Sequence, residues 1–148
     1  MKKYEIFCLE SNRIEGEDRL NPGDEKAFDF AMQGIETLDD ILILHQLLGK
    51  HLQKNWVGKW RECNVKVGQH LPPKWKKIPY LMKRYIEVFP YCNSYQAHND
   101  FELIHPFQDL NGRVGRLIWL SKAVEEGYNF SIPFLQKYYY QTLQANER

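Results

Sequence analysis

Apolar side chains recur along this chain at the spacing of a helix, in stretches separated by short breaks. Spacings of three and four residues over 3–15, 27–35 and 41–52 predict three N-terminal helices. Similar stripes over 81–89, 97–104, 114–124 and 134–145 predict four more. Gly and Pro stand between these stripes, as they do at turns and helix ends. The pattern is typical of an all-α protein.

Several residues mark where these helices begin and end. Thr37 and Asp40 form a capping-box pattern ahead of the third helix, and Asn21-Pro22-Gly23-Asp24 suits the start of the second. Gly16 suits a left-handed end to the first helix, and Pro106 has to end the helix of 97–104. Two helices therefore flank a loop over 105–111.

The helical pattern breaks between Gly58 and Pro73. Val65-Lys66-Val67-Gly68 alternates with a period of two, and Pro72-Pro73 closes the segment. This alternation predicts a short β-hairpin or exposed strand within an otherwise helical chain.

Length and composition indicate one domain over 1–148. The 148 residues are 43% hydrophobic, enough to bury a real core. The net charge of +1 gives no overall field for a polyanion, so we expect no nucleic-acid partner. No apolar stretch approaches the roughly 18 to 20 residues of a membrane span, and the N-terminus lacks a signal-peptide core, so we expect a cytoplasmic protein without membrane contact.

Two residue classes that often bind ligands indicate nothing specific here. Cys8, Cys63 and Cys92 are scattered without metal-ligand spacing, and His98 and His105 have no third ligand nearby, so His98 is expected to pack or to orient the loop. A basic cluster is typical of a solvated helix face and comprises Lys74, Lys76, Lys77, Lys83 and Arg84.

Candidate chemistry is concentrated between His105 and Arg116. A helix that begins near 111 points free N–H groups and the positive end of its dipole into the loop, which favours an anion. Arg113 and Arg116 lie in its first turns, and Asp109 offers a hard oxygen for Mg²⁺. The usual pKa of a histidine lets His105 accept a proton at neutral pH. This combination predicts phosphoryl or nucleotidyl transfer.

The same segment resembles the signature of the Fic family. His105-Pro106-Phe107-Gln108-Asp109-Leu110-Asn111-Gly112-Arg113-Val114-Gly115-Arg116 follows His-Pro-Phe-x-(Asp/Glu)-Gly-Asn-(Gly/Lys)-Arg-x-x-Arg at every defined position except one. The resemblance implies a Fic-like helical bundle with a β-hairpin flap. It also implies a protein adenylyltransferase, which moves AMP from ATP to a Ser, Thr or Tyr hydroxyl of a target protein.

The resemblance assigns a role to each matching residue. His105 would be the general base, Asp109 would hold Mg²⁺, and Arg116 would reach the γ-phosphate. The residues that would cradle the other phosphates are Asn111, Gly112 and Arg113. The flap residues that would dock the protein target by backbone pairing are Val65, Lys66, Val67 and Gly68.

Leu110 is the departure, because the family pattern has Gly there. If the position needs a positive φ, a leucine costs about 1 to 2 kcal/mol or crowds the ligand. Alternatively, Leu110 packs under the loop in an ordinary conformation. Both interpretations are open from the sequence.

A second resemblance lies near the N-terminus. Ser11-Asn12-Arg13-Ile14-Glu15-Gly16 resembles the family's inhibitory motif, (Ser/Thr)-x-x-x-Glu-(Gly/Asn). It implies an inhibitory helix over 1–16 ahead of a core over 17–148. Glu15 would then pair bidentately with Arg116, next to Ser11, and compete with the γ-phosphate.

Three functions are compatible with these residues. The first is an adenylyltransferase restrained by Glu15. The second is the reverse reaction, in which Glu15 orients water to remove AMP. The third is an inactive nucleotide-binding or interaction module, which the departure at Leu110 favours and the presence of His105 opposes. A homo-oligomer is compatible with each.

Overall fold

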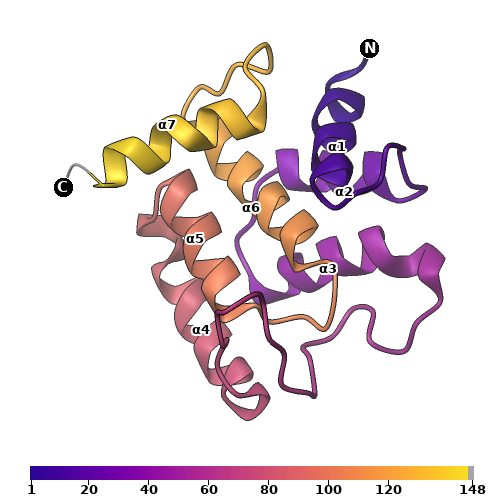
Figure 1. The fold of residues 1–148 in the computed structure, drawn as a ribbon, viewed down its shortest axis with the longest axis vertical. Coiled ribbons are helices and arrows are strands. Elements are labelled where there is room, and N and C mark those ends of the chain that lie inside the picture. The colour runs from indigo at the N-terminus through magenta and orange to yellow at the C-terminus, as the bar shows by residue number, and fades with distance from the viewer. Residues whose placement is uncertain (147–148) are drawn as a thin grey trace.

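The computed structural model describes residues 1–146, and within that range the chain forms seven α-helices (Figure 1). None of them is long and apolar enough to cross a bilayer. They lie where the periodicity predicts them: α1 Lys3–Ile14, α2 Asp24–Met32, α3 Leu38–Gly49, α4 Ile78–Val88, α5 Ser94–Ile104, α6 Asn111–Glu125 and α7 Phe134–Asn146.

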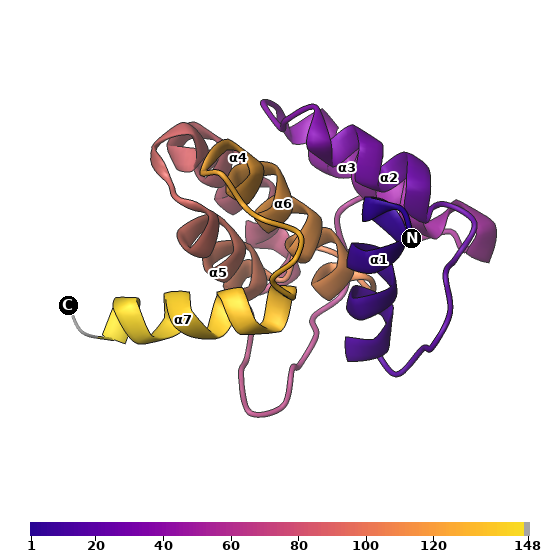
Figure 2. The same ribbon diagram turned by 90° about the horizontal axis from the view of Figure 1, so that it is seen from above.

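Helix α6 is the central element of the fold. It contacts α1, α2, α3 and α5, and the helices surround it in both ribbon views (Figures 1 and 2). Its consecutive apolar residues 117–120 explain this position, because a helix that is apolar on all sides has to be covered on all sides. Even Lys122 is buried, with Nζ donating to the Phe89 carbonyl at 2.6 Å. The N-terminal end of this covered helix carries the candidate site.

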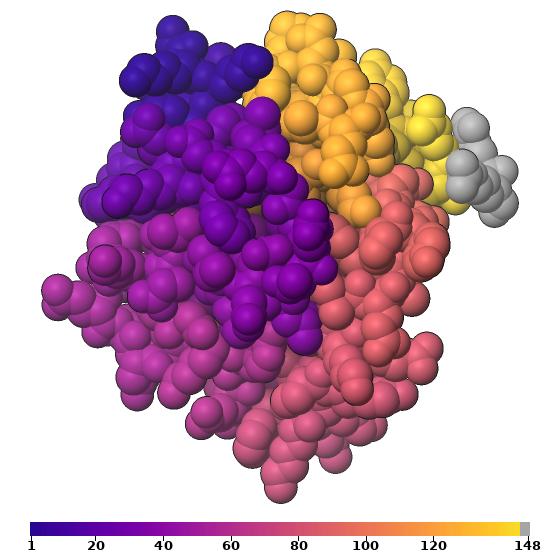
Figure 3. Space-filling view, turned by 180° about the vertical axis from the view of Figure 1, so that it is seen from behind, coloured from indigo at the N-terminus to yellow at the C-terminus, as the bar shows by residue number. Residues whose placement is uncertain are grey.

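Helix α1 packs into the core as well as ending near the site. Phe7 contacts Trp119 and Phe134, with ring centroids 6.5 and 6.2 Å apart. Glu10 accepts hydrogen bonds from the Phe134 N–H at 2.8 Å and the Leu135 N–H at 3.3 Å, at the start of α7. Figure 3 shows the indigo N-terminal residues packed beside the orange residues at the end of α6 and beyond. Removal of α1 would therefore expose part of the core.

Local signals correctly place several helix ends. The Thr37 hydroxyl accepts from the Asp40 N–H at 3.2 Å, and the Asp40 carboxylate accepts from the Thr37 N–H at 3.0 Å, as the capping box predicts. Gly16 has a φ of +85° after α1. At the end of α5, His105 adopts a φ of +52° directly before Pro106, which stops the helix and starts the loop.

The predicted β-hairpin is wrong. Residues 1–146 contain no strand, and over 65–70 they form one isolated antiparallel bridge between Val67 and His70, with N···O distances of 3.0 and 2.9 Å. The ladder cannot continue past His70, because neither residue of Pro72-Pro73 has an N–H to donate. The segment is instead an extended loop that projects beyond the helices (Figure 2). It is tied to α5 by a hydrogen bond of 3.1 Å between the His70 ring and the Leu103 carbonyl.

Candidate functional site

A cavity of about 310 Å³ lies at the N-terminal end of α6. The loop of residues 105–111, hereafter the motif loop, forms one wall of it. The residues that come after α1 form another. Predicted site residues line both walls, among them Glu15, His105, Asp109, Asn111, Gly112 and Arg113. The fold therefore brings together residues that lie about a hundred positions apart in the sequence.

The start of the motif loop is held by Arg61, and no sequence pattern indicates this contact. Arg61 is 2% exposed, and its Nε donates to the His105 carbonyl at 2.7 Å. Its main-chain N–H donates to the Pro106 carbonyl at 2.9 Å. The same guanidinium also donates to the Pro73 carbonyl at 2.5 Å, where the projecting loop returns to the body of the fold. Arg61 thus fixes both the backbone of His105 and the base of that loop.

Asn111 holds the middle of the motif loop. Its side-chain oxygen accepts from the Phe107 N–H at 2.9 Å, and its amide nitrogen donates to the Phe107 carbonyl at 2.7 Å. The side chain is buried and both ends of its amide are occupied. The expectation that Asn111 helps to cradle phosphates therefore fits its main chain, at the first residue of α6, and not its side chain.

His105 lines the edge of the cavity. Burial, followed by the nearby charge of Arg61, lowers its pKa below the usual value of a histidine. Its Nδ1 is buried, with no hydrogen-bond partner in the described part of the chain. A histidine with a lowered pKa is unprotonated at neutral pH and can accept a proton.

Asp109 projects from the motif loop as an exposed carboxylate. One oxygen accepts from the Leu110 N–H at 2.7 Å. Residues 1–146 contain no group of three His, Cys, Asp or Glu side chains arranged to hold a metal ion. A single carboxylate nevertheless suits Mg²⁺ on a nucleotide, because that ion takes most of its ligands from phosphates and water.

Leu110 has the positive φ of the first interpretation and packs as in the second, so the ordinary conformation expected in the second is wrong. Its φ is +70°, the left-handed conformation for which the family pattern has Gly. Its side chain also packs against α3: a Cβ added to Gly49 would lie 3.1 Å from Leu110 Cδ1 and 3.0 Å from Val57 Cγ2. The absence of a side chain at Gly49 therefore makes room for Leu110, which is strained in its backbone but well packed.

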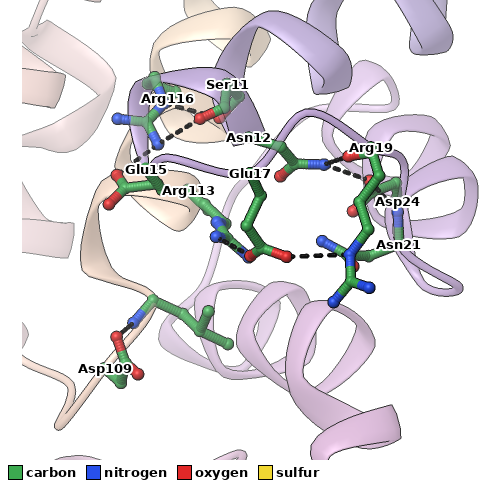
Figure 4. Close-up of polar contacts among 11 residues, drawn as sticks. Ser11, Asn12, Glu15, Glu17, Arg19, Asn21, Asp24, Asp109, Arg113 and Arg116 are labelled. Carbon is green, nitrogen blue, oxygen red and sulfur yellow. Dashed lines mark hydrogen bonds and ion pairs between the residues drawn. The ribbon is translucent and has the colours of Figure 1, made fainter.

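Arg116 is buried against the end of α1 (Figure 4). Its Nε donates to the Ser11 hydroxyl at 2.6 Å, and Nη2 donates to the Ser11 carbonyl at 3.1 Å and to Glu15 Oε1 at 2.7 Å. The expected bidentate pair is wrong, because Ser11 takes the other guanidinium contacts and Glu15 makes one. Ser11, Glu15 and Arg116 are nevertheless brought together.

The Glu15 carboxylate lies against Gly112, in the space that a side chain at this position would fill. A Cβ added to Gly112 would lie only 2.4 Å from Glu15 Oε1. Glycine is therefore the residue that lets an anion approach the start of α6 this closely, where free N–H groups and the helix dipole favour negative charge. In this structure the anion is Glu15.

A second carboxylate, that of Glu17, forms a salt bridge with Arg113, the other arginine of the motif. Arg113 donates to Glu17, and Arg19 Nε donates to the same carboxylate at 3.2 Å (Figure 4). The hydrogen bond from Arg113 is the main cause that lowers the pKa of Glu17. Nothing in the motif pattern indicates this contact, since Glu17 lies just outside it.

The segment that carries both carboxylates is tied to α2. Asn12 Nδ2 donates to the Arg19 carbonyl and to Asp24 Oδ2, each at 2.8 Å. Asp24 is buried and also accepts from the Asn21 N–H at 2.8 Å. The residues over 11–19, hereafter the N-terminal segment, are thus fixed above the cavity.

His98 packs on α7, facing Tyr138 edge to face with ring centroids 5.0 Å apart. Burial lowers its pKa to about 4. On the same helix, burial raises the pKa of Glu102 to about 7, and a Cβ added to Gly115 would lie 2.2 Å from Glu102 Oε1. Gly115 is therefore needed for close packing of α5 and α6.

Comparisons with known proteins show the family of this chain. The Fic/DOC family model matches residues 35–120. The protein adenylyltransferase Fic of Drosophila virilis is 35% identical over 123 residues, which cover 75% of this chain and 25% of that protein. The Drosophila erecta protein of the same name is 35% identical over 129 residues, covering 78% and 26%. This chain thus spans about a quarter of the length of these curated relatives.

Solved structures show the same fold. A Fic family protein from Desulfovibrio desulfuricans G20 superposes with a TM-score of 0.69 at 22% identity, over 83% of this chain and 48% of that one. Fic-1 from C. elegans gives a TM-score of 0.67 at 19% identity, over 97% and 55%. The family match includes the whole motif loop and leaves the N-terminal segment outside. Because it covers more than half of the sequence, this chain belongs to the Fic/DOC family.

Proposed function

We propose that this chain is a protein adenylyltransferase that transfers AMP from Mg-ATP to a hydroxyl side chain of another protein. The observation that supports the proposal is the cavity at the start of α6, because His105, Asp109 and Arg113 all line it and burial lowers the pKa of His105. The names of the curated relatives support the same reaction.

His105 supplies the base in this reaction. The oxygen of the target hydroxyl forms a bond to the α-phosphorus of ATP, and its proton passes to the His105 ring. The bond from the α-phosphorus to the bridging oxygen breaks, and pyrophosphate leaves. Because Nδ1 is buried, we assign the proton to Nε2. Arg61 holds the His105 carbonyl and so fixes the main chain that carries the ring.

The phosphates take the surface that Glu15 and Glu17 occupy in this structure. Gly112 allows their close approach, while Arg113 and Arg116 bind their negative charge. Asp109 would hold Mg²⁺, which when bound neutralises charge on the phosphates. An ATP molecule therefore has to displace carboxylates that already bind both arginines.

This competition is a built-in restraint on the enzyme. Glu15, supported by Ser11, occupies Arg116, and Glu17, supported by Arg19, occupies Arg113. Each contact adds negative charge where a polyphosphate has to bind. We therefore expect low activity in the unmodified chain and higher activity when Glu15 is removed.

The projecting loop docks the protein target. Val65, Lys66, Val67 and Gly68 lie on its outer part, and Lys66, Val67 and Gly68 are exposed. Both main-chain groups of Val67 bind His70, so pairing with a target has to use the neighbouring Lys66. Lys66→Pro should reduce transfer to a protein about tenfold without changing ATP affinity, since one backbone donor is lost. Equal losses in both would contradict a docking role.

The test of the reaction uses Glu15→Gly as the parent, so that the restraint does not mask activity. The protein is incubated with α-labelled ATP, Mg²⁺ and a cell lysate, and labelled protein bands are measured. Adding His105→Ala should lower labelling by about 10²- to 10⁴-fold while ATP still binds, because the phosphate ligands are elsewhere. Arg116→Ala should weaken ATP binding as well. Labelling that survives His105→Ala would contradict the proposal.

The reverse reaction is the second candidate, favoured by the position of the Glu15 carboxylate on Gly112. There it could orient a water molecule toward an AMP-modified side chain. Incubation of an AMP-modified protein with the unmodified chain and with Glu15→Gly distinguishes the two. Release of AMP that depends on Glu15 favours removal, whereas no release and no labelling favour an inactive binding module.

A further inference from the structure

The geometry points to His45 as a positioning residue that fixes the main chain of Asp109, and through it the carboxylate that the proposed function assigns to Mg²⁺. His45 lies on α3, 64 residues before Asp109, and is fully buried. It does not line the cavity and belongs to neither motif. Its effect on the site therefore has to act through the motif loop.

The hydrogen bonds of His45 select one tautomer. The Gly58 N–H donates to Nδ1 at 2.9 Å, and a main-chain N–H can only donate. Nδ1 is therefore unprotonated, so the proton of the neutral ring is on Nε2. Nε2 then donates to the Asp109 carbonyl at 3.0 Å. Burial lowers the pKa of His45 to about 4, which agrees with a neutral ring.

The plane of the ring is fixed as well. His45 stacks on Phe107, with ring centroids 3.8 Å apart and an angle of 2° between the planes. Phe107 is itself buried and held at both main-chain groups by Asn111. The Nε2–H bond consequently points in one direction, toward the motif loop.

The Asp109 carbonyl belongs to the peptide group that sets the carboxylate. The N–H of this same peptide, that of Leu110, donates to the Asp109 side chain at 2.7 Å. Leu110 then continues with a φ of +70° into α6. When His45 holds the carbonyl, the N–H on the other side of the peptide has to point at the carboxylate. Without this bond the peptide can rotate, and the carboxylate loses its fixed orientation.

Two substitutions separate the two hydrogen bonds of His45. In His45→Gln the amide nitrogen can replace Nε2 and keep the bond to Asp109. In His45→Asn the amide oxygen can replace Nδ1 and keep the bond to Gly58. Both remove the aromatic stack and both are close to isosteric with part of the ring, so each serves as the other's control for lost stability.

The experiment measures ATP binding as a function of Mg²⁺ concentration in the Glu15→Gly chain, with thermal unfolding recorded for each variant. His45→Asn should raise the Mg²⁺ concentration for half-maximal ATP binding by about tenfold, the usual loss when the support of a metal ligand is removed. His45→Gln should stay within about threefold of its parent. Equal Mg²⁺ dependence in both variants would overturn the positioning role, leaving His45 as packing alone.

A second measurement needs no variant and no turnover. Nitrogen NMR of the unmodified chain with ¹⁵N-labelled histidine should show His45 protonated on Nε2 and unprotonated on Nδ1 at neutral pH. The opposite tautomer would overturn the assignment even if neither variant folds. Failure of AMP transfer in the Glu15→Gly chain would contradict the proposed function and leave both measurements interpretable.

Discussion

The motif loop and the start of α6 are held from two sides by different kinds of contact. On the side of the N-terminal segment, the contacts join charged side chains, and Glu15 and Glu17 retain 38% and 30% exposure. On the side of α3 and the projecting loop, His45 and Arg61 are at most 2% exposed and donate to main-chain carbonyls. The first set holds the arginine side chains that ATP also needs in the proposed function, and the second holds the backbone.

In the proposed function, the N-terminal contacts regulate the site and the contacts on the α3 side support its backbone. A phosphate can replace a carboxylate on an arginine, because both are anions with similar hydrogen-bond geometry. Nothing in a nucleotide can replace a donor buried beneath the loop. We therefore expect changes on the N-terminal side to raise activity and changes on the α3 side to lower it.

The largest expected effect is activation by Glu15→Gly. Loss of one charge-assisted, partly buried contact is worth about 1.5 to 3 kcal/mol, which corresponds to an increase of roughly tenfold to more than a hundredfold in the competent population. The rate of labelling from α-labelled ATP measures it.

The matched control for this change is Asp18→Gly. Asp18 lies three residues away, is 79% exposed and, among residues 1–146, pairs only with the exposed Arg13. Glu10 is unsuitable, although it lies on α1, because it caps α7. If Glu15→Gly and Asp18→Gly have the same rate, restraint by Glu15 should be abandoned, while the family assignment stands.

On the other side, Arg61→Gln should lower the rate and shift its pH dependence. Loosening the His105 backbone costs on the order of 10- to 100-fold in the Glu15→Gly background, because the base is no longer aligned. In the proposed reaction the unprotonated form of His105 is the active one, so the rate should rise with pH through its pKa, and the charge of Arg61 helps to lower that pKa. Removing this charge should move the acid limb of the profile to higher pH.

The control for Arg61→Gln is Lys59→Gln, which removes a nearby positive charge that is 52% exposed. It should leave the acid limb in place, since an exposed charge is screened by water. An acid limb that does not move in Arg61→Gln would separate Arg61 from the base and leave it a structural role alone.

A smaller activation is expected for Glu17→Gln. The pair of Glu17 with Arg113 is partly exposed, and such pairs contribute about 0.2 to 1 kcal/mol, so ATP should bind roughly 1.5- to 5-fold more tightly. Isothermal titration with Mg-ATP measures the change, with Asp18→Asn as the control. Weaker binding in Glu17→Gln would show that Glu17 supports Arg113 for the nucleotide instead of competing with it.

The sequence predicts the helices well because their signals are local. Periodicity sets the apolar face of each helix, and neighbours such as Thr37 and Asp40 set its ends. The prediction of a hairpin fails because a hairpin does not depend on local signals alone. The alternation of Val65 and Val67 indicates an extended chain, but it does not indicate a partner strand. Pairing depends on a second segment that can donate N–H groups, and Pro72-Pro73 cannot supply them.

The sequence indicates the residues to which we assign the reaction, and it indicates much less of what supports them. His105, Asp109 and Arg116 lie in one short motif, whereas Arg61 acts 44 residues from its partner and His45 acts 64 residues away. One signal for His45 is present: it is a polar residue four positions after Ile41, on the apolar face of α3. The contact geometry of Arg116 is not encoded in spacing, because Ser11 and Glu15 share its donors.

The smallest expected effect concerns Leu110, which joins the two sides of the comparison. Leu110→Gly relieves a left-handed leucine, worth about 1 to 2 kcal/mol, but loses packing against α3 and adds unfolded-state entropy of about 0.4 to 1 kcal/mol. These opposing terms should leave stability within about 1 kcal/mol and ATP affinity within about twofold. Urea unfolding and Mg-ATP titration measure the two quantities.

Gly49→Ala tests the packing of Leu110 against α3 from the side of α3. The added Cβ meets Val57 and Leu110 at 3.0 and 3.1 Å, so it should push on the motif loop and destabilise the chain by about 1 to 3 kcal/mol. If Leu110 is held by this packing, Gly49→Ala should clearly lower the stability of the chain. Leu110→Gly should change the stability and the ATP affinity little. If Leu110→Gly instead tightens ATP binding tenfold, the strain at Leu110, which itself lines the cavity, weakens nucleotide binding, and the α3 side restrains the protein as we propose for the N-terminal side.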